Sequence, residues 1–158
     1  MTEPALTAKT GQNFATADLG AFSQLRQYTF AAPAVPIELE GKVFLNQLLD
    51  LTSAEISLNN IPPGKSVPFY HKHWLNEEIY IFVRGQGEFQ VDDCVFPVQE
   101  GTAVRVSPEG ERCLRNTSDV EDLCSIVIQS RASSYRGHTI IDGVAVEKKV
   151  SWVGKKRI

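Results

Sequence analysis

Short β-prone runs separated by turn residues dominate the sequence from residue 54 onward. Each run has four to eight residues, rich in Val, Ile, Phe and Tyr, and a turn signal follows it. The runs and their turns read AEISLNNI then PPGK, EEIYIFVR then GQG, EFQV then DD, CVFPV then QEG, and TAVRVS then PEG. This pattern predicts antiparallel strands. Because many short strands favour a sandwich or barrel over a parallel α/β sheet, the sequence predicts an all-β fold.

The two flanks of this region carry weaker signals. Residues 1–27 lack a sustained period, so we expect an arm that is loose or wraps around another surface. Residues 28–43 contain two prolines, which favours extended chain at a sheet edge. The run KVFLNQLLDLT is compatible with a strand or a short helix. Near the end, Asp142-Gly143 within HTIIDGVAVEKKVSWV predicts a C-terminal hairpin.

Composition argues against several classes of protein. The chain of 158 residues has 16 basic and 19 acidic residues and a net charge of −3, so no overall field favours nucleic acid or an anionic membrane surface. No run reaches transmembrane length, and the start does not resemble a signal peptide. We therefore expect a cytoplasmic protein. The three cysteines are far apart and odd in number, which predicts free thiols.

The segment HKHWLNEE, residues 71–78, holds two of the three histidines. On an extended strand, residues i and i+2 project to the same face, so His71 and His73 would converge about 7 Å apart along the backbone. Neutral imidazoles in this arrangement suit a divalent metal ion. A carboxylate from Glu77 or Glu78 would complete a two-histidine, one-carboxylate set that leaves coordination positions open. A bare HxH is more often an incidental pair in a surface loop, so the surrounding residues decide the interpretation.

Those residues resemble the first motif of the cupin family. The motif is a glycine, about five residues, HxH, three or four residues, glutamate, about six residues and glycine; here Gly64, HKH, Glu78 and Gly85 follow it, with six residues before His71 and four before Glu78. Counting back from Gly85 selects Glu78 over Glu77 as the equivalent of the glutamate ligand. The alternation agrees, because Glu78 and Tyr80 then share one strand face.

The resemblance covers residues 54–130 and implies a jelly-roll barrel, also called a double-stranded β-helix. We expect an arm at 1–27 and a single barrel domain at 28–158, which has the C-terminal hairpin in addition. In the family, the first-motif histidines and glutamate hold a metal ion together with a histidine from a second motif. The resemblance therefore implies that His71, His73 and Glu78 bind zinc, iron, manganese or nickel.

The second motif lacks its histidine. The stretch GTAVRVSPEGERCLRN preserves Gly101, Pro108, Gly110 and Asn116 of the pattern. Counting forward from Gly110 places Cys113 at the histidine position, whereas counting back from Asn116 places Arg112 there. We favour Arg112, because even spacing puts it on the same strand face as Asn116.

The two alternatives have opposite chemical consequences. A thiolate at Cys113 would complete a four-ligand set and strengthen metal binding. A guanidinium at Arg112 cannot ligate; it would repel a dication and offer hydrogen bonds to Glu78 or to an anionic substrate.

Other side chains near the motifs are candidates for ligand contact. Tyr70 and Trp74 flank the histidines and either rim the mouth of the barrel or cover core, and His138 is expected at the surface. The predicted substrate-binding residues are Tyr80, Arg112 and Asn116. An anionic ligand is expected from the basic residues around the motif strands, namely Lys72, Arg84, Arg105, Arg112 and Arg115.

These observations lead to one leading hypothesis and one alternative. The leading hypothesis is a barrel that binds a divalent metal and a small anionic molecule; the resemblance admits a sugar-phosphate isomerase or a dioxygenase. The alternative is a non-catalytic, metal-free or weakly metallated ligand-binding or sensor protein, which the arginine favours. The resemblance also suggests a homodimer in which residues 28–50 add to the partner's sheet.

Overall fold

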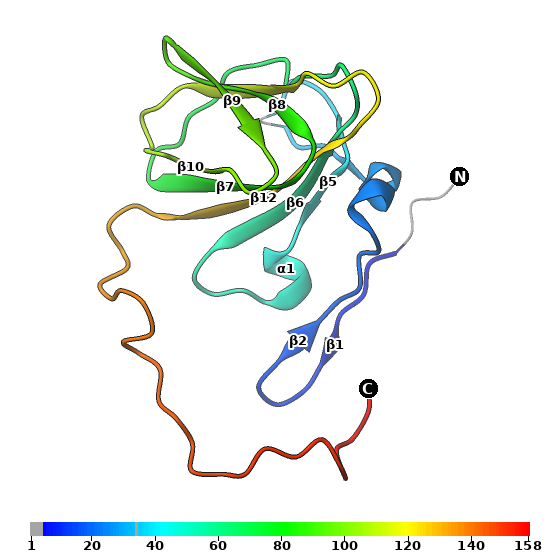
Figure 1. Cartoon of the computed structure of the whole chain (residues 1–158), viewed down its shortest axis with the longest axis vertical. Coiled ribbons are helices and arrows are strands. Elements are labelled where there is room, and N and C mark those ends of the chain that lie inside the picture. Colours follow the sequence, from blue (N-terminus) through cyan, green and yellow to red (C-terminus); the bar gives the residue numbers. More distant parts are fainter. Residues whose placement is uncertain (1–4, 34) are drawn as a thin grey trace.

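The computed structural model describes residues 5–33 and 35–158 and contains two facing antiparallel sheets (Figure 1). The strand order is β10-β7-β12-β6-β5 in one sheet and β11-β8-β9 in the other. The predicted all-β fold is confirmed. The strands of the two sheets are β5 (Lys42–Phe44), β6 (Glu55–Ile61), β7 (Asn76–Arg84), β8 (Gln86–Val91), β9 (Cys94–Gln99), β10 (Ala103–Val106), β11 (Arg112–Asn116) and β12 (Leu123–Arg131).

A hydrophobic core forms between the two sheets because inward-facing apolar residues alternate with outward-facing residues along the strands. On β7, Glu78, Tyr80 and Phe82 are buried, while Ile79 and Ile81 are directed to the opposite face and are more exposed. Side chains from both sheets complete the cluster: Tyr80, Phe82, Phe89, Val98, Val106, Leu114, Leu123 and Val127. Burial of this apolar surface provides the main driving force for closing one sheet over the other.

The tight connection from β7 to β8 depends on Gly85. Its φ is 81°, a left-handed value that glycine adopts without strain, and a Cβ there would collide with the carbonyl oxygen of Asp122. Gly85 therefore holds the end of β7 against the β11–β12 connection. This anchors the register that carries Glu78 into the interior.

The part of the N-terminal segment around the 3-10 helix packs against β5 and β6, whereas the β1–β2 hairpin extends away from the sheets (Figure 1). A second apolar cluster is built on Leu25, Tyr28, Val43 and Leu45. This cluster joins the N-terminal segment to the sheet of the same chain. The run KVFLNQLLDLT forms both a strand, β5, and a short helix, α1. The elements that precede or follow β5 in this part of the chain are β1 (Lys9–Thr10), β2 (Ala15–Thr16), the 3-10 helix η1 (Phe22–Gln27), β3 (Thr29–Phe30), β4 (Leu39–Glu40) and the short helix α1 (Asn46–Leu49).

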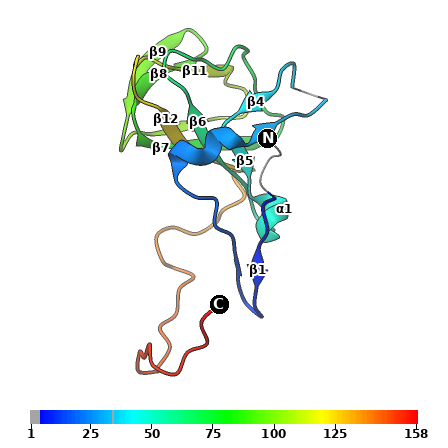
Figure 2. The same ribbon diagram turned by 90° about the vertical axis from the view of Figure 1, so that its right-hand side faces the viewer.

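The predicted C-terminal hairpin is wrong. Residues 132–158 are all described and contain no strand; they run away from the sheets as turns and extended chain (Figures 1 and 2). A β-prone sequence needs a neighbouring strand to pair with, and this segment has none among the described residues. β5 pairs with β6 of the same chain and lies at the edge of the five-stranded sheet, and the addition of residues 28–50 to a partner's sheet stays a prediction.

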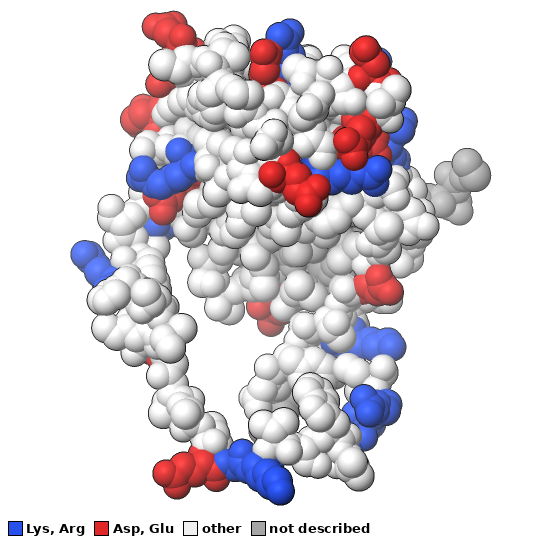
Figure 3. Space-filling model, in the orientation of Figure 1, with Lys and Arg blue, Asp and Glu red and all other residues white. Residues whose placement is uncertain are grey.

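Charges of both signs are distributed over the surface. On the face shown in Figure 3, acidic and basic side chains lie next to one another, in keeping with the small net charge. Among the described residues no helix has the length and hydropathy required to cross a membrane.

Candidate metal centre

Backbone pairing places Arg112 opposite His71. The two residues form an isolated antiparallel bridge: the amide of His71 donates to the carbonyl of Arg112 at 3.2 Å, and the amide of Arg112 donates back at 3.0 Å. Residues directly opposite in such a pair project to the same side. Arg112 therefore enters the interior beside the histidines, and Cys113 projects to the other face, where its Sγ lies 4.0 Å from Gln90 Oε1.

His71, His73 and Glu78 converge at one point. Each offers a ligand atom, and these atoms lie within 4.8 Å of one another. The Nε2 atom of His71 is 3.4 Å from Oε2 of Glu78, and Nε2 of His73 is 3.1 Å from Oε1. The histidines come from the loop between β6 and β7, and Glu78 comes from β7.

The carboxylate of Glu78 is held by further polar contacts. Its Oε2 accepts hydrogen bonds from the hydroxyl of Tyr80 at 2.6 Å and from Nε of Arg112 at 3.0 Å. Burial alone would raise the pKa of Glu78, but contacts with His71, His73 and Tyr80 outweigh it and hold that pKa well below its usual range. Burial and the Glu78 charge raise the pKa of Tyr80. Glu78 is thus an ionised, oriented acceptor.

The donor set fits a divalent metal ion. Two donors that bind one ion at about 2.1 Å lie about 3.0 to 3.4 Å apart. Nε2 of His73 lies 3.1 Å from Oε1 of Glu78, and Nε2 of His71 lies 3.4 Å from Oε2. Nε2 of His73 is buried without a hydrogen-bond partner among the described residues, and such a nitrogen is costly unless it binds something. Oε1 of Glu78, beside this nitrogen, is the carboxylate oxygen that Tyr80 and Arg112 do not contact.

Arg112 supports Glu78 from behind. Its side chain is 0% exposed, and Nη1 donates to the carbonyl of Gly110 at 2.7 Å. The guanidinium points at Glu78 and backbone oxygens and is covered from solvent, while its Nη2 is buried without a hydrogen-bond partner among the described residues. Its role in binding substrate stays a prediction. The sequence left open whether the Arg112 guanidinium contacts Glu78 or an anionic substrate. In the structure it contacts the Glu78 carboxylate.

Asn116 is also placed away from the centre. Its amide donates to the carbonyls of Ile61 and Glu121 at 2.9 and 2.7 Å, and its Oδ1 accepts from the amide of Ser118. These contacts use the side chain to fasten the loop before β12. Its hydrogen-bonding groups are thus occupied by the backbone, and contact of Asn116 with a substrate stays a prediction.

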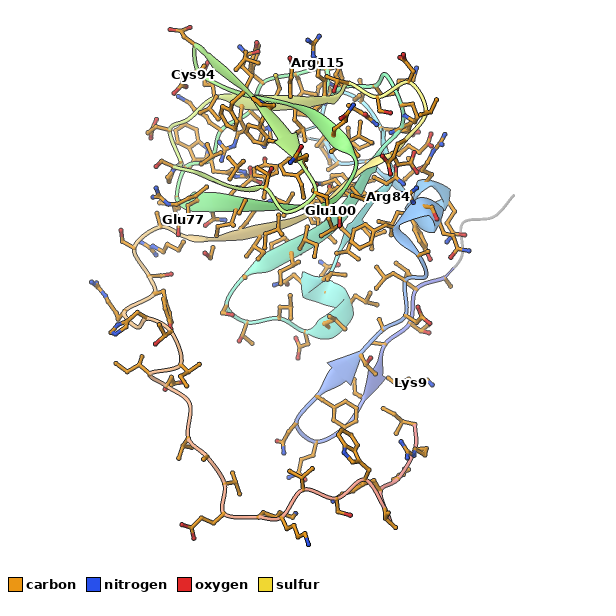
Figure 4. The ribbon with its side chains drawn as sticks, in the orientation of Figure 1. Lys9, Glu77, Arg84, Cys94, Glu100 and Arg115 are labelled. Atoms are coloured by element: carbon orange, nitrogen blue, oxygen red, sulfur yellow. The ribbon has the colours of Figure 1, made fainter. Side chains whose placement is uncertain are left out.

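The remaining candidates lie toward the surface. Glu77 accepts a hydrogen bond from Arg105 at 2.6 Å. Figure 4 shows Glu77 beside the end of β12. Tyr70 and Trp74 are exposed, and His138 lies in the exposed C-terminal segment. Tyr80 remains at the centre, as the donor to Glu78.

A cavity of about 460 Å³ adjoins the metal centre. His71, His73, Glu78 and Tyr80 contribute to its lining, together with Lys42 from the edge strand β5. Lys42 was missed at the sequence level. The one local signal was that Lys42 and Phe44 lie two residues apart in KVF and so share a strand face. A lysine at such a position normally faces solvent.

The comparisons with known proteins agree with the fold. The sequence model of the cupin domain matches residues 57–128. A cupin protein from Bacteroides fragilis, of known crystal structure, is 39% identical with a TM-score of 0.63, and the match covers 66% of this chain and 88% of that one. A protein from Acidithiobacillus ferrooxidans with the proposed identity of a sugar phosphate isomerase is 26% identical with a TM-score of 0.52, over 57% of this chain and 58% of that one.

A curated relative matches a shorter part of the chain. An uncharacterised protein from Methanocaldococcus jannaschii is 32% identical over 60 residues, which are 38% of this chain and 48% of that protein. The match thus spans about half the length of the curated relative. Lys42 lies outside the residues matched by the cupin-domain model.

Proposed function

The chain belongs to the cupin family, and we propose that it binds a divalent metal ion through His71, His73 and Glu78 and a small anionic molecule in the adjoining cavity. One observation carries this proposal. Two histidines and a carboxylate meet at metal-ligand spacing beside a cavity, and the buried Nε2 of His73, which faces Glu78, has no hydrogen-bond partner among the described residues.

The roles of the protein groups follow from their contacts. When bound, the metal would supply a Lewis acid or, as iron, an oxygen-binding centre. Glu78 acts as a ligand and not as a base, because its polar contacts keep it ionised at low pKa. Tyr80 and Arg112 orient it by binding Oε2. Three protein ligands leave coordination positions for the small molecule.

Elemental analysis of the purified protein tests the metal site. We expect close to one metal ion per chain in the native protein, loss of that metal in His71→Ala/His73→Ala, and no loss in His138→Ala. The last variant is the matched control, because His138 is exposed and far along the chain from the centre. Equal metal content in all three proteins would exclude His71 and His73 as ligands.

A weakly metallated binding protein is the second candidate. It is supported by the Arg112 guanidinium, which lies 3.0 Å from the only carboxylate of the three-residue set and offsets its charge. Cation repulsion would lower metal affinity. In that case chelator-treated protein should keep its melting temperature and still be stabilised by its ligand; loss of ligand binding upon chelation would exclude this candidate.

The relative from Acidithiobacillus ferrooxidans supports a sugar phosphate as one substrate class to test. An isomerase of this kind would exchange a substrate proton with solvent. Deuterium exchange into a panel of sugar phosphates, followed by NMR with the metal-loaded protein, measures this step. If the native protein exchanged no faster than the His71→Ala/His73→Ala variant, isomerase activity toward these substrates would be excluded.

A homodimer is proposed for the assembly. The C-terminal segment exposes many apolar side chains that its own chain does not cover, including Ile140, Ile141, Val144, Val146, Val150 and Trp152. Surfaces of this kind are usually buried by another chain. Light scattering should give twice the chain mass, and Ile140→Ser/Ile141→Ser/Val144→Ser should shift it toward monomer. A native monomer at micromolar concentration would refute the dimer.

A further inference from the structure

Lys42 places a cation in the cavity on the wall formed by β5 and β6. Its Nζ donates to Oδ1 of Asn59 at 2.7 Å and to Oγ of Ser57 at 3.2 Å, and lies 4.9 Å from the centre of the Phe44 ring. Pairing aligns this wall: Lys42 is opposite Asn59, and Phe44 is opposite Ser57. The amino group is therefore fixed in position by a rigid sheet.

All the hydrogen-bond partners of Lys42 are neutral. Among the described residues it forms no ion pair, so the charge is stabilised by two oxygen dipoles and one ring. Burial lowers the pKa of Lys42 to about 8, although the charges of Glu78 and Glu55 act in the opposite direction. At neutral pH the group is still mostly protonated. An ammonium has three donors, and one of them is left without an acceptor.

The other cation on the cavity wall is already paired. Nζ of Lys72 lies 3.6 Å from a carboxylate oxygen of Glu109 and 4.0 Å from one of Glu111, at an exposed position. Arg112 is covered and committed to Glu78. Within the described part of the cavity, Lys42 is thus the cation whose charge is available to a ligand.

Much of the cavity lining is apolar. Its apolar side chains include Phe30, Leu39, Phe44, Val67, Phe69 and Leu114, and its neutral polar ones include Asn59, Asn60, Ser125 and Gln129. A sugar carries hydroxyls along its length, and each would need a partner when buried. A lining with more apolar than polar surface favours a ligand with an apolar body. One free ammonium donor matches one carboxylate, whereas a phosphate dianion would leave several charged oxygens without donors.

We propose that Lys42 is the anion-binding residue of the cavity and that its ligand is a carboxylate with an apolar body, which extends from the Lys42 amino group toward His71, His73 and Glu78. The position of the end of the ligand that lies toward His71, His73 and Glu78 rests on the proposed function. The position of its carboxylate rests only on Lys42 and the neighbouring residues of β5 and β6.

Isothermal titration calorimetry with 3-phenylpropanoate tests the proposal, with 3-phenylpropanamide and glucose 6-phosphate as comparison probes. The proteins are the native chain, Lys42→Met and the matched control Lys72→Met, which removes the same charge at the cavity mouth. We expect Lys42→Met to weaken 3-phenylpropanoate binding roughly 10- to 100-fold. Lys72→Met should change it by about twofold or less, because that charge is paired and exposed.

Three controls separate the outcomes. The melting temperature of Lys42→Met should equal or exceed that of the native chain, which excludes a folding defect as the cause of weaker binding. The neutral amide should bind native protein and Lys42→Met equally. Metal content, measured on the same samples, should be unaffected by Lys42→Met, so failure of the metal site and failure of the Lys42 site are read independently.

Equal loss in Lys42→Met and Lys72→Met, or no binding of 3-phenylpropanoate to the native chain, would overturn the assignment of Lys42. Tighter binding of glucose 6-phosphate than of 3-phenylpropanoate would overturn the ligand class. If metal is absent but Lys42→Met still loses carboxylate binding, the metal proposal fails and the Lys42 proposal stands.

Discussion

Each of the two sheets directs a cation inward, and the surroundings of the two cations differ. Arg112, on the three-stranded sheet, is fully covered and contacts a carboxylate at 3.0 Å. Lys42, on the edge of the five-stranded sheet, contacts the neutral oxygens of Ser57 and Asn59. A buried charge that has its counter-ion is part of the architecture, whereas one without it retains the capacity to bind an anion. The difference distinguishes a residue that orients Glu78 from one that faces the cavity.

Removing the paired cation should have the largest effect on stability. Arg112→Met leaves the Glu78 carboxylate and the Gly110 carbonyl without their buried donor, and we expect a loss of about 3 to 5 kcal/mol in the free energy of unfolding. Urea denaturation measures it. The control is Arg115→Met, since Arg115 pairs with Glu88 at an exposed position that Figure 4 shows on the outside of the barrel, and should cost about 1 kcal/mol or less. Equal losses would show that the Arg112–Glu78 pair has no special role.

Removing the unpaired cation should change the pH dependence of stability. The pKa of Lys42 is about 8 in the folded protein and about 10.5 in its ordinary state. Between these values the unfolded chain binds more protons, so native stability rises with pH across that range. Relative to Lys42→Met, the native chain should gain about 2 to 3 kcal/mol between pH 8 and 10.5. Parallel stability curves for the two proteins, from denaturation at each pH, would contradict an unpaired buried lysine.

Supplying Lys42 with a counter-ion should make it resemble Arg112. Asn59→Asp places a carboxylate where Oδ1 now accepts from Nζ at 2.7 Å. The added charge should raise the pKa of Lys42 and compete with an external anion, which lowers 3-phenylpropanoate affinity about tenfold while stability changes by about 1 kcal/mol. The control is Asn59→Ser, which adds no charge. If Asn59→Asp bound the carboxylate as tightly as Asn59→Ser, the anion would not sit at Lys42.

Local spacing along the chain was enough to predict much of the fold. The alternation of β7 and the turn at Gly85 placed Glu78, Tyr80 and Phe82 on one face, as the structure has them. The resemblance to the cupin motif, counted back from Gly85, selected Glu78 over Glu77, and the structure brings Glu78 to the two histidines. Such features depend on residues within one strand and its adjoining turn, where the period of two leaves little freedom.

Features that depend on distant segments required the tertiary structure. The choice between Arg112 and Cys113 turned on a one-residue shift, and the pairing of Arg112 with His71, 41 positions away, decides it. The C-terminal hairpin was predicted from propensity and a turn, yet no strand forms there.

The sequence by itself therefore determined the strand pattern, through its short periodic spacing, and the grouping of His71, His73 and Glu78, through a motif of closely spaced residues. Only the tertiary structure decided that Arg112 supports Glu78 and that Lys42 shares a cavity with the metal centre. The physical reason is that the environment of a buried charge is made by strands from the whole chain, so no local pattern records whether a cation meets a carboxylate or only neutral oxygens.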